Sequence, residues 1–149
     1  MKNLNKFFVK TVQELAKQSN CVSHKVGCLI IKDDRIISMG YNGTPAGFKN
    51  CNEVFSENYF NREEHHQWSL RYEIHAEINA LMYAAKNGIS TSGATMICSL
   101  EPCDNCLKAI IQSGITTLYF LKKYDKKLPY DSAFKEYIES KLLIKEISI

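Results

Sequence analysis

Residues 94–121 have the sequence ATMICSLEPCDNCLKAIIQSGITTLYFL, in which two apolar runs flank an amphipathic one. The apolar runs at 94–100 and 116–121 predict strands, and residues 103–112 predict a helix between them. Ser113 and Gly114 follow this helix and are typical of a helix end. A strand, a helix and a second strand in this order favour an α/β fold.

The rest of the chain extends this alternation. Residues 26–31, VGCLII, predict a buried strand, and residues 35–41 its hairpin partner after a turn at Asp33-Asp34. Residues 42–64 lack periodicity and predict a long loop. The remaining elements are helices at about 5–18, 76–87 and 133–141 and a last strand at 142–149. This order predicts a mixed sheet with helices on both faces, in a single domain over residues 1–149.

Composition excludes several classes of protein. Of the 149 residues, 45% are hydrophobic and 23% charged, as in ordinary soluble domains, and no apolar run is long enough to span a membrane. Residues 1–18 show helical periodicity rather than the apolar core of a secretion signal, which predicts a cytoplasmic protein. Six cysteines in that compartment favour metal binding or catalysis over disulfides. The net charge of +3 suits a small anionic ligand and predicts no nucleic-acid partner.

Two short motifs carry the chemistry, His75-Ala76-Glu77 and Pro102-Cys103-Asp104-Asn105-Cys106. The two cysteines lie three residues apart at the start of a predicted helix, which places both sulfurs on one face. Two thiolates and one imidazole make three ligands for Zn²⁺ and leave the fourth tetrahedral position to water, as in catalytic sites. His75 and Glu77 can face one site only at the N-terminal end of a helix. We therefore expect the zinc between the N-termini of two helices.

Each motif alone has other interpretations. An isolated His-x-Glu is common, and Cys-x-x-Cys also occurs in redox pairs and in structural zinc sites. A redox pair leaves His75 and Glu77 unexplained, and a structural site needs a fourth Cys or His where the motif has Glu. Together and in this order, the two motifs match the signature of zinc-dependent deaminases.

The chain resembles the cytidine deaminase-like superfamily, and within it the phage-type deoxycytidylate (dCMP) deaminases, over about residues 20–127. The likeness is carried by residues 25–30, 40–47, 50–51, 73–80 and 100–106. It implies a three-layer α/β/α sandwich around a mixed sheet of about five strands. It also implies zinc-dependent hydrolysis of dCMP to dUMP and ammonia, which supplies the precursor of dTMP.

The resemblance also implies roles for residues in two metal sites. His75, Cys103 and Cys106 bind the catalytic zinc, and Glu77 moves protons between water, ring N3 and the departing ammonia. A second, structural zinc would be held by Cys21, Cys51, His65 and Glu73, a set that spacing alone does not identify as a metal site. Cys28 and Cys98 lie in predicted strands and are expected in the core.

Asn42 has two interpretations. Asn-Gly after a strand is a tight-turn signal, whereas the resemblance places the Asn42 amide at the substrate. The same segment is associated with effector nucleotides, with dCTP as activator and dTTP as inhibitor, together with Mg²⁺. The implied effector residues are Gly40, Tyr41, Asn42 and Gly43, with Tyr83 and Lys86 as further candidates. Packing at a subunit contact is the alternative for Tyr83, because a hexamer is common among the enzymes that the chain resembles.

A mononucleotide also needs a phosphate pocket. The basic candidates are Lys25, Lys123 and Lys126, with Tyr124 as a hydroxyl donor. A lysine-rich loop is more often simply a solvated surface.

Three other functions remain open from the sequence. A tRNA adenosine deaminase shares the zinc motif but would be expected to carry a basic surface. A deaminase of free cytidine often has Cys in place of His75. A zinc-stabilised binding module without catalysis predicts no use for Glu77.

Overall fold

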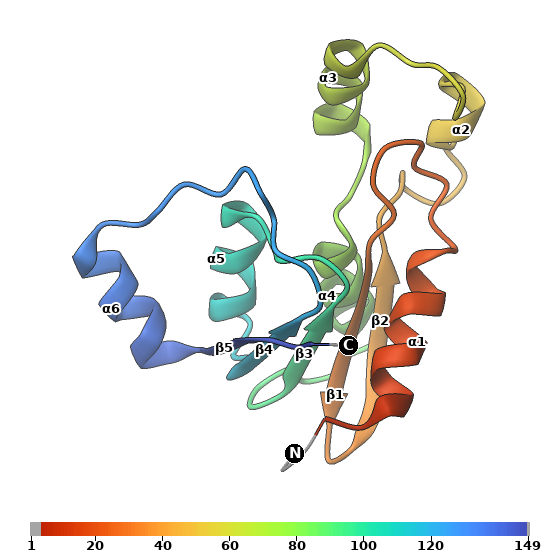
Figure 1. Cartoon of the computed structure of the whole chain (residues 1–149). Helices are drawn as coiled ribbons and strands as arrows, with labels where there is room; N and C mark the ends of the chain where they lie inside the picture. Colours follow the sequence, from red (N-terminus) through yellow and green to blue (C-terminus); the bar gives the residue numbers. More distant parts are fainter. Residues whose placement is uncertain (1–3, 149) are drawn as a thin grey trace.

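In the computed structural model, which describes residues 4–148, one mixed sheet has the strand order β2-β1-β3-β4-β5 (Figure 1). The pairs β1–β2 and β1–β3 are antiparallel, and β3–β4 and β4–β5 are parallel. The elements in chain order are α1 (Lys6–Ala16), β1 (Gly27–Lys32), β2 (Arg35–Tyr41), α2 (Cys51–Val54), α3 (Arg62–Tyr72), α4 (Ala76–Lys86), β3 (Thr95–Cys98), α5 (Asp104–Gln112), β4 (Thr117–Phe120), α6 (Ser132–Lys141) and β5 (Leu143–Glu146). Residues 1–3 of the predicted domain and residue 149 of the predicted last strand lie outside the described residues.

Two hydrophobic clusters lie on opposite faces of the sheet and make three layers. On one face, Phe8 and Val12 of α1 pack with Leu29, Ile31 and Ile97 of the sheet. On the other face, α4, α5 and α6 bury their apolar side chains against the alternate residues of β1, β3 and β4. The expected α/β/α sandwich with a mixed five-stranded sheet is therefore confirmed. No helix within residues 4–148 is both long and apolar enough to cross a membrane.

Two local features place α4 against the hairpin. Asp33 and Asp34 have positive φ values of 53° and 58°, so they form the tight type I′ turn that joins β1 to β2. At the other end of β2, Gly40 lies so close to α4 that a Cβ there would be 2.6 Å from the Ala76 carbonyl oxygen. Glycine thus lets the first turn of α4 rest directly on the strand.

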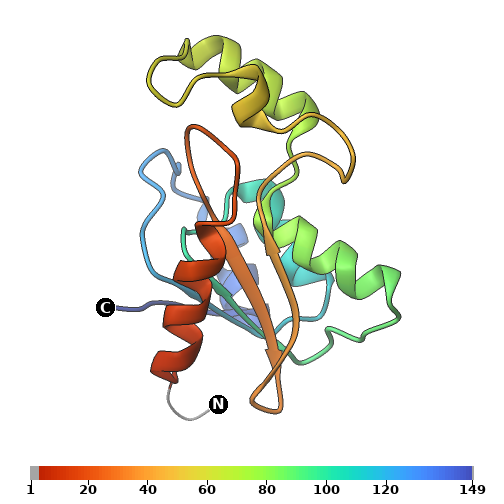
Figure 2. The same cartoon turned by 90° about the vertical axis from the view of Figure 1, so that its right-hand side faces the viewer.

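The predicted loop over residues 42–64 is partly wrong, because it contains α2 and the beginning of α3. Helix α3 has no apolar face, and His65 is its one buried residue, so hydrophobic periodicity gives no signal there. Its beginning is instead marked by Asn61, whose side chain accepts a hydrogen bond from Glu64 N at 3.0 Å. Helices α2 and α3 lie beyond one end of the sheet, outside the three layers (Figures 1 and 2).

The tight turn predicted at Asn42-Gly43 is also wrong. Neither residue has the positive φ that such a turn requires. Gly43 instead pairs with Ile74 just before α4, where the two residues exchange backbone hydrogen bonds of 3.1 and 2.7 Å. The chain after β2 is therefore extended and pinned to the residues that lead into the next helix of the sandwich.

Candidate active site and metal centres

The N-terminal ends of α4 and α5 bring together His75, Cys103 and Cys106. His75 is the N-cap residue of α4 and Cys103 that of α5, and Cys106 lies in the first turn of α5. His75 Nδ1 lies 3.5 Å from Cys103 Sγ and 3.3 Å from Cys106 Sγ. Ligand bonds of about 2.0–2.3 Å in a zinc tetrahedron separate neighbouring ligand atoms by about 3.3–3.8 Å. The three side chains therefore fit one zinc ion and leave one of its positions open.

The two thiols of this cluster differ in how easily they ionise. The hydrogen bond from Cys106, together with His75, lowers the pKa of Cys103 to about 4, so Cys103 is a thiolate at neutral pH. Cys106 keeps its proton in the hydrogen bond between the two cysteines, because this bond and burial raise its pKa. The same thiolate raises the pKa of His75 through a hydrogen bond. A metal ion here would bind the Cys103 thiolate and displace the protons that Cys106 and His75 hold more tightly.

Glu77 lies in the first turn of α4, beside the cluster, and only 3% of its surface is exposed. Burial raises the pKa of its carboxyl group, and a hydrogen bond with Cys106 and the charge of His75 act in the opposite direction. A carboxyl group with a raised pKa can both accept and donate a proton near neutral pH.

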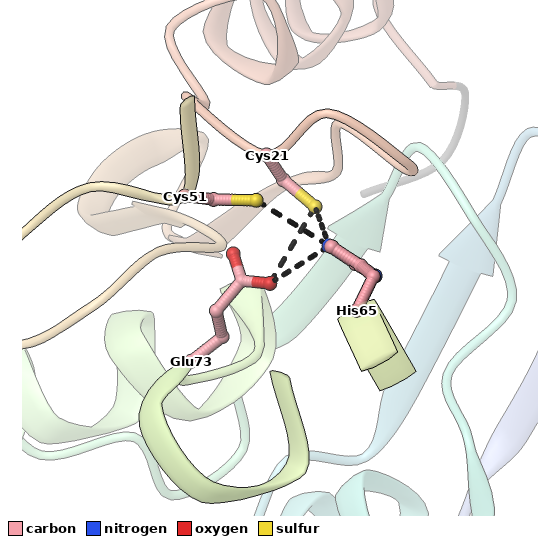
Figure 3. Close-up of side chains that lie close together, drawn as sticks. All are labelled: Cys21, Cys51, His65 and Glu73. Carbon is pink, nitrogen blue, oxygen red and sulfur yellow. Dashed lines mark hydrogen bonds and ion pairs between the residues drawn. The ribbon is translucent and has the colours of Figure 1, made fainter. Parts of the chain in front are cut away.

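A second cluster joins Cys21, Cys51, His65 and Glu73 (Figure 3). His65 Nε2 lies 3.6 Å from Cys21 Sγ and 3.3 Å from Cys51 Sγ. Glu73 Oε1 lies 3.6 Å from Cys21 Sγ and 3.6 Å from His65 Nε2. These separations match the edges of a zinc tetrahedron, and four protein ligands close the coordination sphere as in structural sites.

The second cluster also has the chemistry of a cation site. The Glu73 side chain is 2% exposed, and its Oε2 has no hydrogen-bond partner among the described residues. A buried carboxylate oxygen without a partner is costly, and a metal ion bound here would supply that partner. Burial raises the pKa of Cys21 to about 12 and also raises that of Cys51, so both thiols hold their protons until a metal displaces them.

Three consecutive residues connect the two clusters. Glu73 belongs to the second cluster and His75 to the first. Between them, Ile74 is hydrogen-bonded to Gly43. The position of His75 therefore depends on the two residues before it, Glu73 in the second cluster and Ile74 in its pairing with Gly43.

A cavity of about 500 Å³ adjoins the second cluster. Its wall includes three residues of that cluster, Cys21, Cys51 and Glu73. All the residues that the resemblance associates with effectors line the same cavity: Gly40, Tyr41, Asn42, Gly43, Tyr83 and Lys86. A volume of this size is in the usual range for small-molecule sites.

Comparison with known proteins places this geometry in a family. The family model of the cytidine and deoxycytidylate deaminase zinc-binding region matches residues 2–122. The chain belongs to this family. It is 40% identical to the deoxycytidylate deaminase of Enterobacteria phage T4, with 77% of this chain and 76% of the phage protein covered. The crystal structure of dCMP deaminase from the cyanophage S-TIM5, in complex with dCMP and dUMP, has a TM-score of 0.74 and 29% identity over 95% of both chains.

Within this deaminase fold, the Asn42 side chain holds the loop between α1 and β1. Its Oδ1 accepts a hydrogen bond from Val26 N at 2.9 Å, and its Nδ2 donates to the His24 carbonyl at 2.7 Å. Asn42 thus fixes the backbone on both sides of Lys25.

The candidate phosphate ligands have different surroundings. Lys25 pairs with Glu57 at 3.6 Å and Lys123 with Glu146 at 3.9 Å. Lys126 makes no ion pair with a carboxylate of residues 4–148. Tyr124 donates its backbone N–H to Glu101 Oε1 at 3.1 Å. Lys126 is therefore the candidate most available to an anion.

Three basic residues near this group were missed by the sequence interpretation. Burial lowers the pKa of His24, and the positive charges of Arg62, Lys122 and Lys126 lower it further, so these charges lie within electrostatic range of His24. They come from the loop before β1, the start of α3 and the segment after β4. Because the segments are far apart in the sequence, no spacing relates them.

Cys28 and Cys98 lie in the core, as predicted. Both are fully buried register partners on β1 and β3, with 3.8 Å between their sulfurs. Neither belongs to a metal cluster.

Proposed function

We propose that this chain catalyses the hydrolysis of dCMP to dUMP and ammonia, which supplies the precursor of dTMP. The observation that carries the proposal is the cluster of His75, Cys103 and Cys106, with three metal ligands rather than four and the buried Glu77 beside them. Relatives named deoxycytidylate deaminase support the choice of substrate.

In this mechanism His75, Cys103 and Cys106 hold zinc, which when bound supplies a Lewis acid that activates water. Glu77 takes a proton from the attacking water and delivers it to ring N3. Glu77 then takes the second proton of the former water from the C4 hydroxyl and passes it to the amino group, which departs as the C4–N bond breaks and the C4 carbonyl forms. Water and dCMP are thus converted to dUMP and ammonia, and Glu77 returns to its starting state. Burial raises the pKa of Glu77, which favours both transfers.

The same proposal gives Cys21, Cys51, His65 and Glu73 a structural zinc. The unpartnered Glu73 oxygen and the tetrahedral separations support it. A zinc ion here would attach α2 and α3, which lie outside the sandwich, to the loop that follows α1.

We assign the substrate phosphate to the basic group near His24. Lys25, Tyr124 and Lys126 are its proposed ligands, and Arg62 and Lys122 add positive charge. Asn42 belongs to the substrate site because it holds the loop that carries Lys25. When phosphate binds, Lys25 exchanges its exposed contact with Glu57 for a dianion.

Regulation is proposed at the cavity lined by Tyr41, Tyr83 and Lys86, with dCTP and Mg²⁺ as activator and dTTP as inhibitor. Exposed apolar side chains next to this cavity, Met39, Met82 and Tyr83, support subunit contacts there in a hexamer. Sedimentation should show a hexamer, and dCMP saturation should shift in opposite directions with dCTP and dTTP. A monomer with unchanged saturation would contradict regulation while leaving the catalytic proposal intact.

The catalytic proposal is tested by ammonia release from four compounds, dCMP, cytidine, dCTP and adenosine in tRNA. The expected result is a kcat/KM for dCMP that exceeds each of the others by at least about a hundredfold, because only dCMP combines the cytosine ring with a phosphate of the right size. Preferential turnover of tRNA or of free cytidine would refute it.

A further inference from the structure

The segment at 122–131, between β4 and α6, passes over the N-terminal end of α5 (Figure 1). It carries Tyr124 and Lys126, two of the proposed phosphate ligands. We call it the strap. The strap has little regular structure of its own, so its position depends on contacts with the residues around Cys103.

The first contact is made by Glu101, two residues before Cys103. Glu101 N donates to the Lys122 carbonyl at 2.8 Å, and Glu101 Oε1 accepts from Tyr124 N at 3.1 Å. Glu101 Oε2 pairs with Lys127 Nζ at 3.6 Å. Both side chains of this pair are largely buried, with 21% of Glu101 and 16% of Lys127 exposed. Lys127 also neutralises a carboxylate that would otherwise repel a phosphate.

The second contact is made by Asp104, immediately after Cys103. Its Oδ1 accepts a hydrogen bond of 2.5 Å from the Tyr130 hydroxyl. Burial and the neighbouring Asp104 raise the pKa of Tyr130, so its hydroxyl keeps the proton that it donates. Lys127 Nζ lies 5.3 Å from the centre of the Tyr130 ring, which joins the two contacts into one network.

We propose that Glu101 and Asp104 are positioning residues that hold the strap, and with it Tyr124 and Lys126, at a fixed place relative to the metal ligand Cys103. Because the two carboxylates flank Pro102-Cys103, the same four residues contain the metal ligand and both contacts to the strap. The distance between the reacting centre and the phosphate ligands is then set by two local contacts. This inference rests on the proposed deamination of dCMP.

The test uses two variants of the holoenzyme that leave the metal ligands unchanged. Tyr130→Phe removes the hydroxyl bonded to Asp104 but keeps the ring, and Glu101→Gln removes the charge paired with Lys127. Tyr137→Phe, at an exposed tyrosine of α6, is the matched control. Hydrogen exchange of residues 122–131, zinc content, and kcat and KM for dCMP and deoxycytidine are measured for each protein.

Both variants should bind as much zinc as the wild type and exchange faster over 122–131. The KM for dCMP should rise about tenfold, the effect of losing roughly one hydrogen bond or partly buried ion pair, with kcat nearly unchanged. Deoxycytidine has no phosphate, so its kcat/KM should stay within about twofold. The control should match the wild type in every measurement.

Several outcomes would overturn the inference. Unchanged exchange would show that the two contacts do not hold the strap. Faster exchange with an unchanged KM for dCMP would remove the positioning role, and equal losses for dCMP and deoxycytidine would indicate a general structural defect. These outcomes leave wild-type turnover of dCMP intact. Failure of the wild type itself to deaminate dCMP would instead overturn the proposed function and this role together.

Discussion

Glu77 lies next to the three proposed metal ligands and is almost completely buried. Glu77→Gln keeps the size of the side chain but removes the proton that it exchanges. We expect the variant to retain its zinc and to lose about 10²–10⁴-fold in kcat, the usual contribution of general acid–base catalysis. Glu64→Gln, the same substitution in the exposed first turn of α3, is the control and should be fully active. Near-normal turnover by the Glu77 variant would exclude the proton-transfer role.

The phosphate ligands allow a second test at the scale of single residues. Deoxycytidine leaves the basic group around Lys126 without its anion, a loss of about 3–4 kcal/mol or a few hundred-fold in kcat/KM. Raised salt should weaken dCMP more than deoxycytidine, because only dCMP depends on the charges that salt screens. Measurement of kcat/KM for both compounds at two ionic strengths decides the point. Similar values for the two would mean that no phosphate pocket exists.

The site residues differ in how far they could be predicted from the sequence. Two short motifs at the N-termini of α4 and α5 could be recognised from their residue types and spacing alone. They contain His75, Glu77, Cys103 and Cys106. The basic group of His24, Arg62 and Lys122 could not be predicted, because Arg62 and Lys122 come within electrostatic range of His24 only after three distant segments fold. Lys25 and Lys123 were named from charge alone, and both form ion pairs with glutamates.

Among the elements, the contact of β2 with α4 depends on one glycine. A Cβ at Gly40 would meet the Ala76 carbonyl and Ala80 N at 2.6 Å, and backbone cannot move aside without shifting the helix. Gly40→Ala should therefore destabilise the protein by about 1–3 kcal/mol, as overpacking does, and lower activity by displacing Glu77. Gly43→Ala is the matched control, since nothing lies within 4 Å of a Cβ there. Urea unfolding should separate the two, and equal stabilities would contradict the close packing.

Helix α3 packs Trp68 against Phe55 and Tyr72 against Phe48, and in our proposal a zinc ion bound by His65 fixes it further. Cys51→Ser should reduce the zinc content from about two ions per chain to about one and lower the melting temperature. Because Glu73 and His75 are two residues apart, the remaining zinc should also be removed more readily by a chelator. Cys28→Ser, which alters a buried thiol outside both clusters, should keep both ions. One zinc per wild-type chain under metal-replete conditions would disprove the second site.

The presence or absence of an apolar pattern explains which elements could be predicted from the sequence. Helices α1 and α5 carry apolar side chains at helical spacing and β1 is a continuous apolar run, so the pattern indicates them. Helix α3 buries His65, a polar residue whose partners are spread from residue 21 to residue 73. Asn61 caps the start of α3 by accepting a hydrogen bond from Glu64 N, but a cap without an apolar stripe does not by itself indicate a helix.

For the whole molecule, metal binding should be coupled to pH. The thiols of Cys21 and Cys51 are protonated at neutral pH because burial raises the pKa of both, and zinc binds them as thiolates. Binding therefore releases protons, and affinity falls as pH falls, by about tenfold per released proton for each pH unit. Calorimetry in buffers of different ionisation enthalpy measures the protons released. Binding without proton release at pH 7 would show that the thiols are already ionised.

The position of β1 between β2 and β3 also affects how the chain is made. The hairpin of β1 and β2 closes locally, but Cys28 on β1 pairs with Cys98 on β3, 70 residues later. At synthesis rates of about 5–20 residues per second, the ribosome takes roughly 4–14 s to supply that partner. For this interval the second edge of β1 is open to strands of other nascent chains. Slower initiation, which spaces ribosomes along the message, should therefore increase the soluble yield of this protein more than faster elongation does.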